Sequence, residues 1–557
     1  MMKTNRRIIQ GISIGILILL STALPLYLVF RSQEDRIPSN PIIIWNNDDF
    51  INYGFSGEGS KENPYLIENL EIITEYIYGI NIKNTDKYFV IRNCYVDASE
   101  IGIYLDNIAN ETAIIIENIC TDNEIGIKVS DSDEISITKN ECLENDYYAG
   151  AGIVVLNSNR CNLTQNYCYS NEFFGIKLEN TESCYVYNNT CIANEGYFQG
   201  AGIYVYVSDN TILEHNVCRG NMLDGIHIHL SENTFVVDNL CEENYVRGLY
   251  MRLSYHTVIA NNTILSNLNW GGQISHGMEI EYSSFFNLTG NTIDSNRGNG
   301  ITLRQTSDSH IHSNIIANQI EYPNSLITPY MIYLGEKGYL GYGIFVYSSS
   351  NLEVTENTWT YNYGGCWLED VYNANITLNH CQNNREQSIR ILNSDECSLN
   401  NNTISSNKVG VIVNDTLTTT IAFNKIHGSN SYGLSFLGSS SDNLVYQNSF
   451  KNNNLGGSSQ GYDEGTNNIW YNNVTKKGNY WLDRVSGNYS IDGPSNSEDI
   501  YCLDEDPLLY LESNLPITTQ EKVFDFQLLT ILFRDKAYCI SFFVFQLTRT
   551  IVRKGKN

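Results

Sequence analysis

The sequence predicts an all-β protein, a single-stranded parallel β-helix of about 15 coils behind an N-terminal membrane anchor helix. A short glycine-containing pattern recurs along most of the chain, usually at steps of 22 to 24 residues. An Asn follows the pattern at a fixed distance in nearly every copy, and an apolar run stands near the N-terminus. A repeat of this period indicates a solenoid, in which each coil packs only on its neighbours.

The apolar run predicts the anchor and the location of the rest of the chain. Basic residues within 3–7 precede an apolar stretch at 8–30, which at roughly 22 residues is long enough to cross a bilayer. Positive charge before such a stretch places its start on the cytoplasmic side. We therefore expect a single-pass anchor in the cell membrane, with the β-helix extracellular or periplasmic. Secretion after cleavage of a signal peptide is the alternative.

The repeat is a Gly-apolar-x-apolar tetrad with an Asn 14 residues after the glycine in most copies. Short apolar alternations between turn-forming residues are typical of strands. The Asn suits a turn because it tolerates left-handed backbone angles and its amide can hydrogen-bond along the stack. The tetrads begin at Gly79, Gly102, Gly126, Gly152, Gly175, Gly202, Gly225, Gly248, Gly277, Gly300, Gly343, Gly365, Ser388, Gly410 and Gly433.

Cysteine follows the same period. Several cysteines, from Cys120 to Cys241, stand two residues after the Asn of consecutive coils, where other coils carry Ile. We interpret them as free thiols that replace aliphatic side chains in the core. An occasional disulfide is the alternative, and no metal site is assigned because no Cys-x-x-Cys spacing occurs.

The repeat and its flanks define the expected organisation of the chain. The segments are an anchor (1–31), a linker (32–41), an N-terminal cap (42–78), the β-helix repeats (79–483), a C-terminal cap region (484–520) and an accessory tail (521–557). The apolar patches of the tail are each too short to cross a bilayer. A second membrane contact is the alternative for this tail.

Two motif regions outside the tetrads indicate a family. Gly-Glu-Gly-Ser at 57–60 and Asn-Pro-Tyr-Leu-Ile-Glu at 63–68 precede the coils, and Gly-Asn-Tyr-Trp-Leu-Asp at 478–483 follows them. With the repeat between them, the chain resembles the NosD-type family of carbohydrate-binding and sugar-hydrolase (CASH) repeat proteins. The resemblance implies a right-handed, pectate-lyase-like β-helix in an exported protein. It does not supply an activity, because one fold hosts many functions.

The strand of each coil reads Gly-apolar-x-apolar-x, with one further residue after the tetrad. Its two x positions face outward, since side chains alternate between the faces of a strand. In the middle coils these positions become aromatic, His or charged, as suits sugar rings and their hydroxyl groups. We predict a glycan-binding groove there, walled by insertions at 197–199, 270–273 and 322–342. The predicted substrate-binding residues are Tyr204, Tyr206, His227, Tyr250, Arg304, Tyr347, Trp367, Glu369 and Arg390.

Two reaction types stay open for this groove, with Glu279, Glu281, His229 and Arg252 as the catalytic candidates. Glu279 and Glu281 share one strand face with their Cα atoms about 6.8 Å apart, a separation that side-chain rotamers could adjust toward either glycosidase geometry. Alternatively, His229 or Tyr250 abstracts a proton from a uronate. Arg252 or Arg304 would then neutralise the carboxylate of that uronate, as in a polysaccharide lyase.

The net charge of the chain bears on its partners and cofactors. The net charge of −28 argues against a nucleic-acid partner, which needs a surplus of Lys and Arg. No cofactor is assigned, although the acidic surface would suit Ca²⁺. The protein is expected to be a monomer.

A non-catalytic surface or adhesive rod is the main alternative, because ladders of outward side chains also stabilise a sheet without any ligand. A copper-site accessory role is the other alternative, which the resemblance to NosD-type proteins implies. His227 and His229 form a His-x-His pair, but two His alone do not make a metal site.

Overall fold

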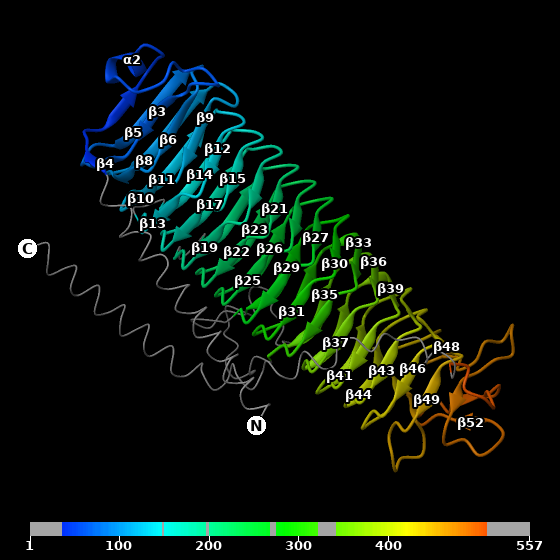
Figure 1. Cartoon of the computed structure of the whole chain (residues 1–557). Coiled ribbons are helices and arrows are strands. Elements are labelled where there is room, and N and C mark those ends of the chain that lie inside the picture. Colours follow the sequence, from blue (N-terminus) through cyan, green and yellow to red (C-terminus); the bar gives the residue numbers. More distant parts are fainter. Residues whose placement is uncertain (1–35, 147–149, 196–199, 268–274, 321–340, 509–557) are drawn as a thin grey trace, which may run out of the picture. The chain divides into compact units, whose positions relative to one another are not determined.

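The computed structural model describes residues 36–146, 150–195, 200–267, 275–320 and 341–508. Over these residues the chain is an all-β parallel solenoid of about 16 turns, as the sequence predicts apart from one additional turn. In Figure 1 the colours run in order along the stack, so coils that are neighbours in the sequence are neighbours in space. A short helix, α2 (Asp49–Tyr53), precedes most of the coils.

Each turn contributes one strand to each of three parallel sheets. The tetrad strands form what we call the glycine sheet: β2 (Ile42–Ile44), β5 (Tyr78–Thr85), β8 (Ile101–Ile108), β11 (Ile125–Ser130), β14 (Ala151–Leu156), β17 (Phe174–Glu179), β20 (Ala201–Tyr206), β23 (Asp224–His229), β26 (Arg247–Arg252), β29 (His276–Glu281), β32 (Ile301–Arg304), β35 (Tyr342–Tyr347), β38 (Gly364–Glu369), β41 (Gln387–Leu392), β44 (Val409–Asn414), β47 (Leu434–Leu437) and β50 (Gly461–Asp463).

The next strand of each turn belongs to the second sheet: β3 (Tyr65–Glu68), β6 (Phe89–Arg92), β9 (Ala113–Ile116), β12 (Ser136–Thr138), β15 (Asn162–Thr164), β18 (Tyr185–Tyr187), β21 (Ile212–Glu214), β24 (Phe235–Val237), β27 (Val258–Ala260), β30 (Asn287–Thr289), β33 (Ser307–His312), β36 (Ser350–Thr355), β39 (Tyr372–Thr377), β42 (Ser398–Asn400), β45 (Thr420–Ala422) and β48 (Leu444–Tyr446).

The third sheet completes the turn: β1 (Ile37–Pro38), β4 (Leu70–Ile73), β7 (Tyr95–Asp97), β10 (Ile119–Thr121), β13 (Glu141–Leu143), β16 (Tyr167–Tyr169), β19 (Thr190–Ile192), β22 (Val217–Arg219), β25 (Leu240–Glu242), β28 (Thr263–Leu265), β31 (Thr292–Asp294), β34 (Ile315–Ala317), β37 (Thr358–Thr360), β40 (His380–Gln382), β43 (Thr403–Ser405), β46 (Lys425–His427), β49 (Ser449–Lys451) and β51 (Tyr480–Trp481).

The additional turn lies ahead of the first tetrad, within residues 42–78. There β2, β3 and β4 pair in parallel with β5, β6 and β7. Strand pairing therefore starts before the glycine pattern does, and part of the segment expected to be a cap has the geometry of a coil.

The tetrad has a clear physical role in the stack. Ile226 and Ile228 of β23 are fully buried in the core, whereas His227 and His229 between and after them face outward. A Cβ atom on Gly225 would lie 2.5 Å from the carbonyl oxygen of Gly248. Glycine is needed there because the neighbouring coil approaches too closely for any side chain.

The Asn repeat forms the amide ladder that the sequence predicts. In one rung, Nδ2 of Asn239 donates to Oδ1 of Asn262 at 3.0 Å and to the Leu213 carbonyl at 2.9 Å. Its Oδ1 accepts the backbone N–H of Asn216 at 2.8 Å. Each rung thus satisfies buried backbone groups of two turns, which would be costly to leave unpaired.

The cysteines that the structure describes all carry free thiols. Those at the predicted core positions are buried and in register, as in the pair Cys218 and Cys241. Burial raises the pKa of Cys366 and Cys381, that of Cys381 to about 12. These thiols behave as small apolar side chains of the core.

The C-terminal end of the solenoid is closed by aromatic side chains. The ring of Trp481 stacks on Phe450 at 4.3 Å and on Tyr489 at 4.1 Å between centroids. The buried carboxylate of Asp499 accepts the indole N–H of Trp481 at 2.9 Å. A short antiparallel pair, β52 (Tyr489–Ser490) and β53 (Glu498–Asp499), completes this end.

Several predictions fall on residues outside the described part of the chain. They are the anchor at 1–31, the tail at 521–557, and the groove walls at 197–199, 270–273 and 322–340. Among the described residues, no helix has the length and apolar character to span a membrane.

Candidate functional site

All thirteen predicted site residues lie on the outward side of the glycine sheet, in two columns that follow the strand register. The first column holds Tyr204, His227, Tyr250, Glu279, Thr302, Phe345, Trp367 and Arg390. The second column holds Tyr206, His229, Arg252, Glu281, Arg304, Tyr347, Glu369 and Leu392. Strand pairing therefore aligns these residues in two continuous columns, although the first and last of them are more than 180 positions apart in the sequence.

A third set of outward residues, which the sequence analysis missed, stands immediately before the tetrad glycine. We call it the leading column, and Asp224, Arg247 and His276 follow one another in it. In the two coils before them this position is apolar, as Phe174 and Ala201. In the sequence, the change from apolar to charged residues at this one position could have revealed the leading column.

An ion-pair network links the leading column to the first and second columns. Arg247 contacts Asp224 through Nε at 2.8 Å and Glu279 through Nη1 at 2.8 Å. Nε of Arg304 lies 3.2 Å from the other carboxylate oxygen of Glu279. Because these side chains are largely buried, the charges interact strongly and compensate one another.

The network sets the protonation state of Glu279, which is only 6% exposed. Burial alone would raise the pKa of this carboxyl, but the positive charges around it, Arg247 first, outweigh burial and lower the pKa to about 2. Glu279 is therefore ionised at neutral pH. A general acid has to hold a proton, so this arrangement favours Glu279 as the partner of two arginines over Glu279 as a proton donor.

Tyr250 is also engaged within the face. Its hydroxyl donates to Oε2 of Glu281 at 2.8 Å, and Cζ of Arg247 lies 3.6 Å from its ring centroid. Burial, together with the charge of Glu281, raises the pKa of Tyr250. The hydroxyl is thus protonated at neutral pH and orients the Glu281 carboxylate.

The two histidines differ in their surroundings. The ring of His227 packs between Tyr204 at 4.8 Å and Tyr250 at 4.7 Å, and its Nδ1 lies 3.3 Å from Asp224. Its Nε2 has no hydrogen-bond partner within the described part of the chain. Burial and the nearby charges of His227 and Arg252 lower the pKa of His229, so this ring is neutral at pH 7.

The far end of the face is an aromatic cluster. Trp367 is only 1% exposed and packs edge-on against Tyr342 and Phe345. Cζ of Arg390 lies 4.6 Å from a Trp367 ring centroid. The predicted contact of Trp367 with a ligand stays untested. In the second column Tyr206, His229 and Arg252 are half-buried or exposed, whereas Glu369 is buried.

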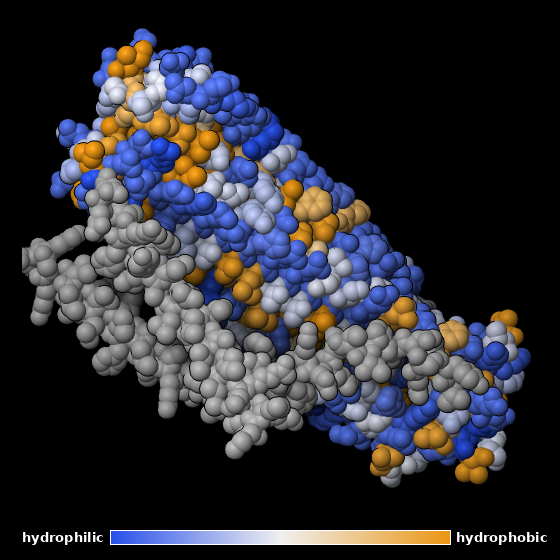
Figure 2. Space-filling view, viewed as in Figure 1, coloured by the Kyte–Doolittle hydropathy of each residue, from blue (hydrophilic) through white to orange (hydrophobic). Residues whose placement is uncertain are grey.

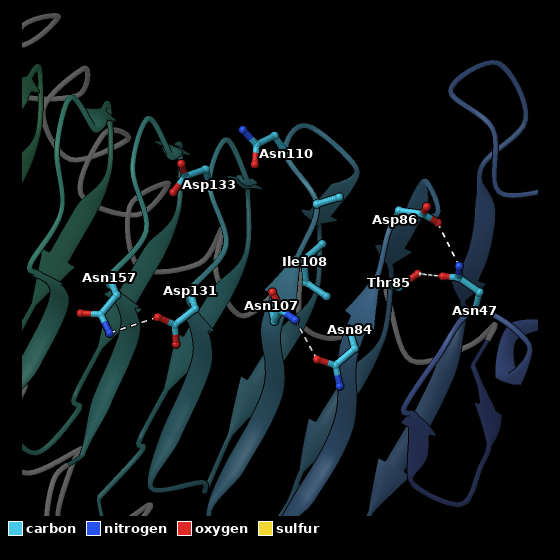
Figure 3. A pocket seen from close by; sticks show the side chains of 11 residues that line it. Asn47, Asn84, Thr85, Asp86, Asn107, Ile108, Asn110, Asp131, Asp133 and Asn157 are labelled. Carbon is cyan, nitrogen blue, oxygen red and sulfur yellow. Dashed lines mark hydrogen bonds between the residues drawn. The ribbon is translucent and has the colours of Figure 1, made fainter.

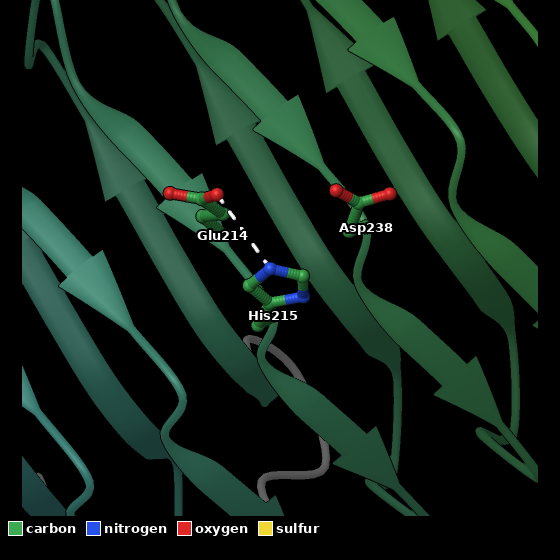
Figure 4. Close-up of side chains that lie close together, drawn as sticks. All are labelled: Glu214, His215 and Asp238. Carbon is green, nitrogen blue, oxygen red and sulfur yellow. Dashed lines mark ion pairs between the residues drawn. The ribbon is translucent and has the colours of Figure 1, made fainter.

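Two other groupings of polar side chains lie outside this face. Glu214, His215 and Asp238 place one ligand atom each within 4.8 Å of one another (Figure 4), and His215 Nε2 lies 3.6 Å from Glu214. They offer one imidazole and two carboxylates at an exposed turn, which is a common surface arrangement.

The second grouping is an open pocket of about 690 Å³ between the first coils, lined by amide and carboxylate side chains (Figure 3). These side chains hydrogen-bond along the stack, as Asn107 does to Asn84 at 2.8 Å and Asn157 to Asp131 at 3.2 Å. The pocket is therefore the outer surface of a side-chain ladder.

Comparison with known proteins shows which family the sequence matches. The family described as "Periplasmic copper-binding protein (NosD)" matches residues 175–329 and 334–487. The family described as "Right handed beta helix region" matches residues 39–191. No curated protein matches the chain.

Solved structures show distant likeness. A mutant of the periplasmic alginate epimerase AlgG is 13% identical, with 80% of this chain and 88% of that chain covered and a TM-score of 0.32. The surface adhesin PfbA of Streptococcus pneumoniae is 13% identical, with coverages of 56% and 84% and a TM-score of 0.35. Gene product 12 of bacteriophage phi29 is 12% identical, with coverages of 84% and 78% and a TM-score of 0.43.

Proposed function

The chain belongs to the NosD family, and from that premise we propose that it works outside the cytoplasm and binds a polysaccharide along the outward face of the glycine sheet. The periplasmic description of the family supports the location. An anchor at residues 1–31 would hold the β-helix at the membrane surface.

The observation that carries this proposal is the continuous register of aromatic, His and Arg side chains on one face. From β20 to β26 the second column presents Tyr206, His229 and Arg252 side by side. Aromatic rings stack on the apolar faces of sugars, while the charged and imidazole groups hydrogen-bond to hydroxyl groups.

The donor sets of the described residues do not fit copper, which the family description names. His227 and His229 lie beside Arg247 and Arg252, whose charges would repel a cation. The group around His215 supplies a single imidazole, and the thiols that soft Cu(I) prefers are almost all buried in the core. No step of the proposed function uses a metal.

Cleavage of the bound chain is a second candidate function, and one observation favours it. The lowered pKa of His229 leaves its ring neutral, as a general base has to be. Arg252 in the same column would face the sugar from which a proton is taken.

The test is a glycan array and a polysaccharide-depolymerisation assay with the full-length protein. We expect retention of at least one polysaccharide, and about tenfold or greater weakening in the double variant Tyr206→Ala, His229→Ala, which corresponds to about 1.4 kcal/mol. The matched control is Asn414→Ala, Leu437→Ala, which makes the same change at the second outward position of two consecutive strands, β44 and β47. It should bind like the wild type.

Three outcomes separate the candidates. Unsaturated products would establish a lyase, and new reducing ends without unsaturation would establish a hydrolase. Retention without cleavage would establish a binding protein. If the wild type retained no polysaccharide, or if the variant and the control bound equally, the proposal would be wrong and a surface rod would be favoured.

A further inference from the structure

The turn that follows each glycine-sheet strand has the same left-handed backbone in every coil, from Asn84 with φ of 53° to Gly438 with φ of 60°. This region favours Asn, Asp and Gly. We call the residues at this turn the edge column. They are Asn84, Asn107, Asp131, Asn157, Asn180, Val207, Leu230, Leu253, Tyr282, Gln305, Ser348, Asp370, Asn393, Asp415 and Gly438.

Six consecutive coils, from Val207 to Ser348, depart from the preference of the edge column. The first four of them carry bulky side chains, Val207, Leu230, Leu253 and Tyr282, at φ of 48°, 53°, 50° and 51°. Bulky side chains are disfavoured at such angles, and a β-branched Val most of all. Three of the four are also exposed to solvent, Val207 at 40%, Leu230 at 41% and Tyr282 at 43%. We call these four residues the apolar edge.

The apolar edge also lacks the side-chain hydrogen bonds that link neighbouring coils at this turn. At several other positions of the edge column the side chains bond along the stack, as Asn180 Nδ2 does to Asn157 at 3.3 Å and Asn393 Nδ2 to Asp370 at 2.6 Å. Val and Leu side chains have no polar atoms with which to continue such a ladder. The fold would therefore be more stable with Asn at these positions, and residues that oppose stability are typical of functional sites.

The apolar edge adjoins the candidate site. Each of its residues directly follows a second-column residue in the chain, namely Tyr206, His229, Arg252 and Glu281. Cζ of Arg252 lies 5.5 Å from the ring centroid of Tyr282. The second sheet continues the surface with exposed Ile212 and Phe235, and Figure 2 shows apolar side chains gathered over these middle coils, near β21 and β27.

We propose that the apolar edge is one wall of the glycan site and that it selects neutral, β-linked pyranose chains over polyuronates. The proposal rests on the proposed function, names its substrate class and, because a lyase acts on a uronate, excludes the lyase reaction. Sugars with equatorial hydroxyl groups expose apolar ring faces, which pack on aliphatic and aromatic side chains. One pyranose is about as long as the step between coils, so successive rings would meet successive edge residues.

The charges of the site agree with a neutral ligand. The cations Arg247, Arg252 and Arg304 lie beside the carboxylates of Asp224, Glu279 and Glu281. A polyuronate would have to displace a carboxylate from these arginines, and it would meet a chain of net charge −28.

The test replaces the apolar edge with Asn, the commonest residue at this turn in the other coils. The variant Val207→Asn, Leu230→Asn, Leu253→Asn, Tyr282→Asn should melt at a higher temperature than the wild type, by about a few °C. Its retention of a neutral β-linked glucan should fall about tenfold or more. Polygalacturonate should be retained poorly by both proteins.

The matched control is Asn107→Leu, which makes the opposite change at the same turn, far from the site. It should lower Tm and leave glucan retention unchanged. The single variant Leu230→Asn should show both effects of the fourfold variant in smaller size, so the test does not depend on how that variant folds.

Three results would overturn the inference: an unchanged or lower Tm of the fourfold variant, undiminished retention of glucan by that variant, or stronger retention of polygalacturonate than of glucan by the wild type. If instead the proposed function were wrong, the wild type would retain no glycan of any class.

Discussion

At the scale of single residues, the site depends on compensation between buried charges. Glu279 lies between Arg247 and Arg304, and its pKa falls although burial alone would raise it. Two carboxylates on one strand face suggest a hydrolase from the sequence, but a carboxyl that stays ionised serves better to hold arginines in place. Only the neighbours in adjacent coils distinguish the two roles.

The lowered pKa of Glu279 predicts how stability depends on pH. A carboxyl whose pKa is lower in the folded state than its ordinary 4.5 stabilises the fold above pH 4.5 and loses that contribution as the pH falls toward about 2. Glu279→Gln removes the carboxylate that two largely buried arginines share and leaves Arg247 only with Asp224 and Arg304 only with Glu281. We therefore expect about 2–3 kcal/mol of destabilisation at pH 7. The difference from the wild type should shrink below pH 4.5, as measured by urea unfolding across pH.

Glu353→Gln is the control for this prediction, because Glu353 pairs with His310 on an exposed surface. It should change stability little at any pH. A Glu279→Gln variant as stable as the wild type at pH 7 would contradict the network described here.

At the scale of elements, the amide ladder explains how turns of different length stay in register. The rung from Asn239 to Asn262 spans 23 residues, and the next, from Asn262 to Asn291, spans 29. The hydrogen-bond lengths are the same, at 3.0 Å. The longer connection therefore does not disturb the rungs.

We predict that Asn239→Ala destabilises the solenoid by about 2–4 kcal/mol, because it leaves the buried N–H of Asn216 and the carbonyl of Leu213 without partners. Chemical denaturation measures the change. Asn430→Ala, at an exposed turn, is the control and should have little effect. Equal stability of the two variants would show that the ladder does not stabilise the fold.

At the scale of the whole solenoid, each coil is stabilised mainly by its neighbours, so the ends need particular protection. The described C-terminal end is covered by Trp481, which lies between Phe450 and Tyr489. Opening this stack would expose the core of the last coils.

Trp481→Ala should therefore destabilise the solenoid locally, by about 3–5 kcal/mol at that end. We expect hydrogen exchange to become faster in β46 and β49 while β11 to β20 keep their protection, because stability in a solenoid is a sum of neighbour terms. Hydrogen exchange followed by mass spectrometry of peptides would resolve the two regions. Faster exchange along the entire stack would contradict this view of the solenoid.

The tetrad and its Asn predict several properties that each coil repeats, although not the leading column or the edge column. The tetrad predicts which side chains enter the core, as it does for Ile226 and Ile228, because alternation along a strand is local. The ladder Asn, the core thiols and the two outward columns follow from the same period. The first turn was missed because β2 has no tetrad glycine, although β2 pairs with β5.

The contacts between coils could be known only from the stacked structure. Arg247 meets Glu279 across 32 residues, Trp367 packs under other aromatic rings, and four bulky residues accept left-handed turns at the rim of the site. Burial, charge compensation and backbone strain arise from contacts between separate turns. A pattern along the chain specifies the columns, but stacking decides which neighbours touch and how much water reaches them.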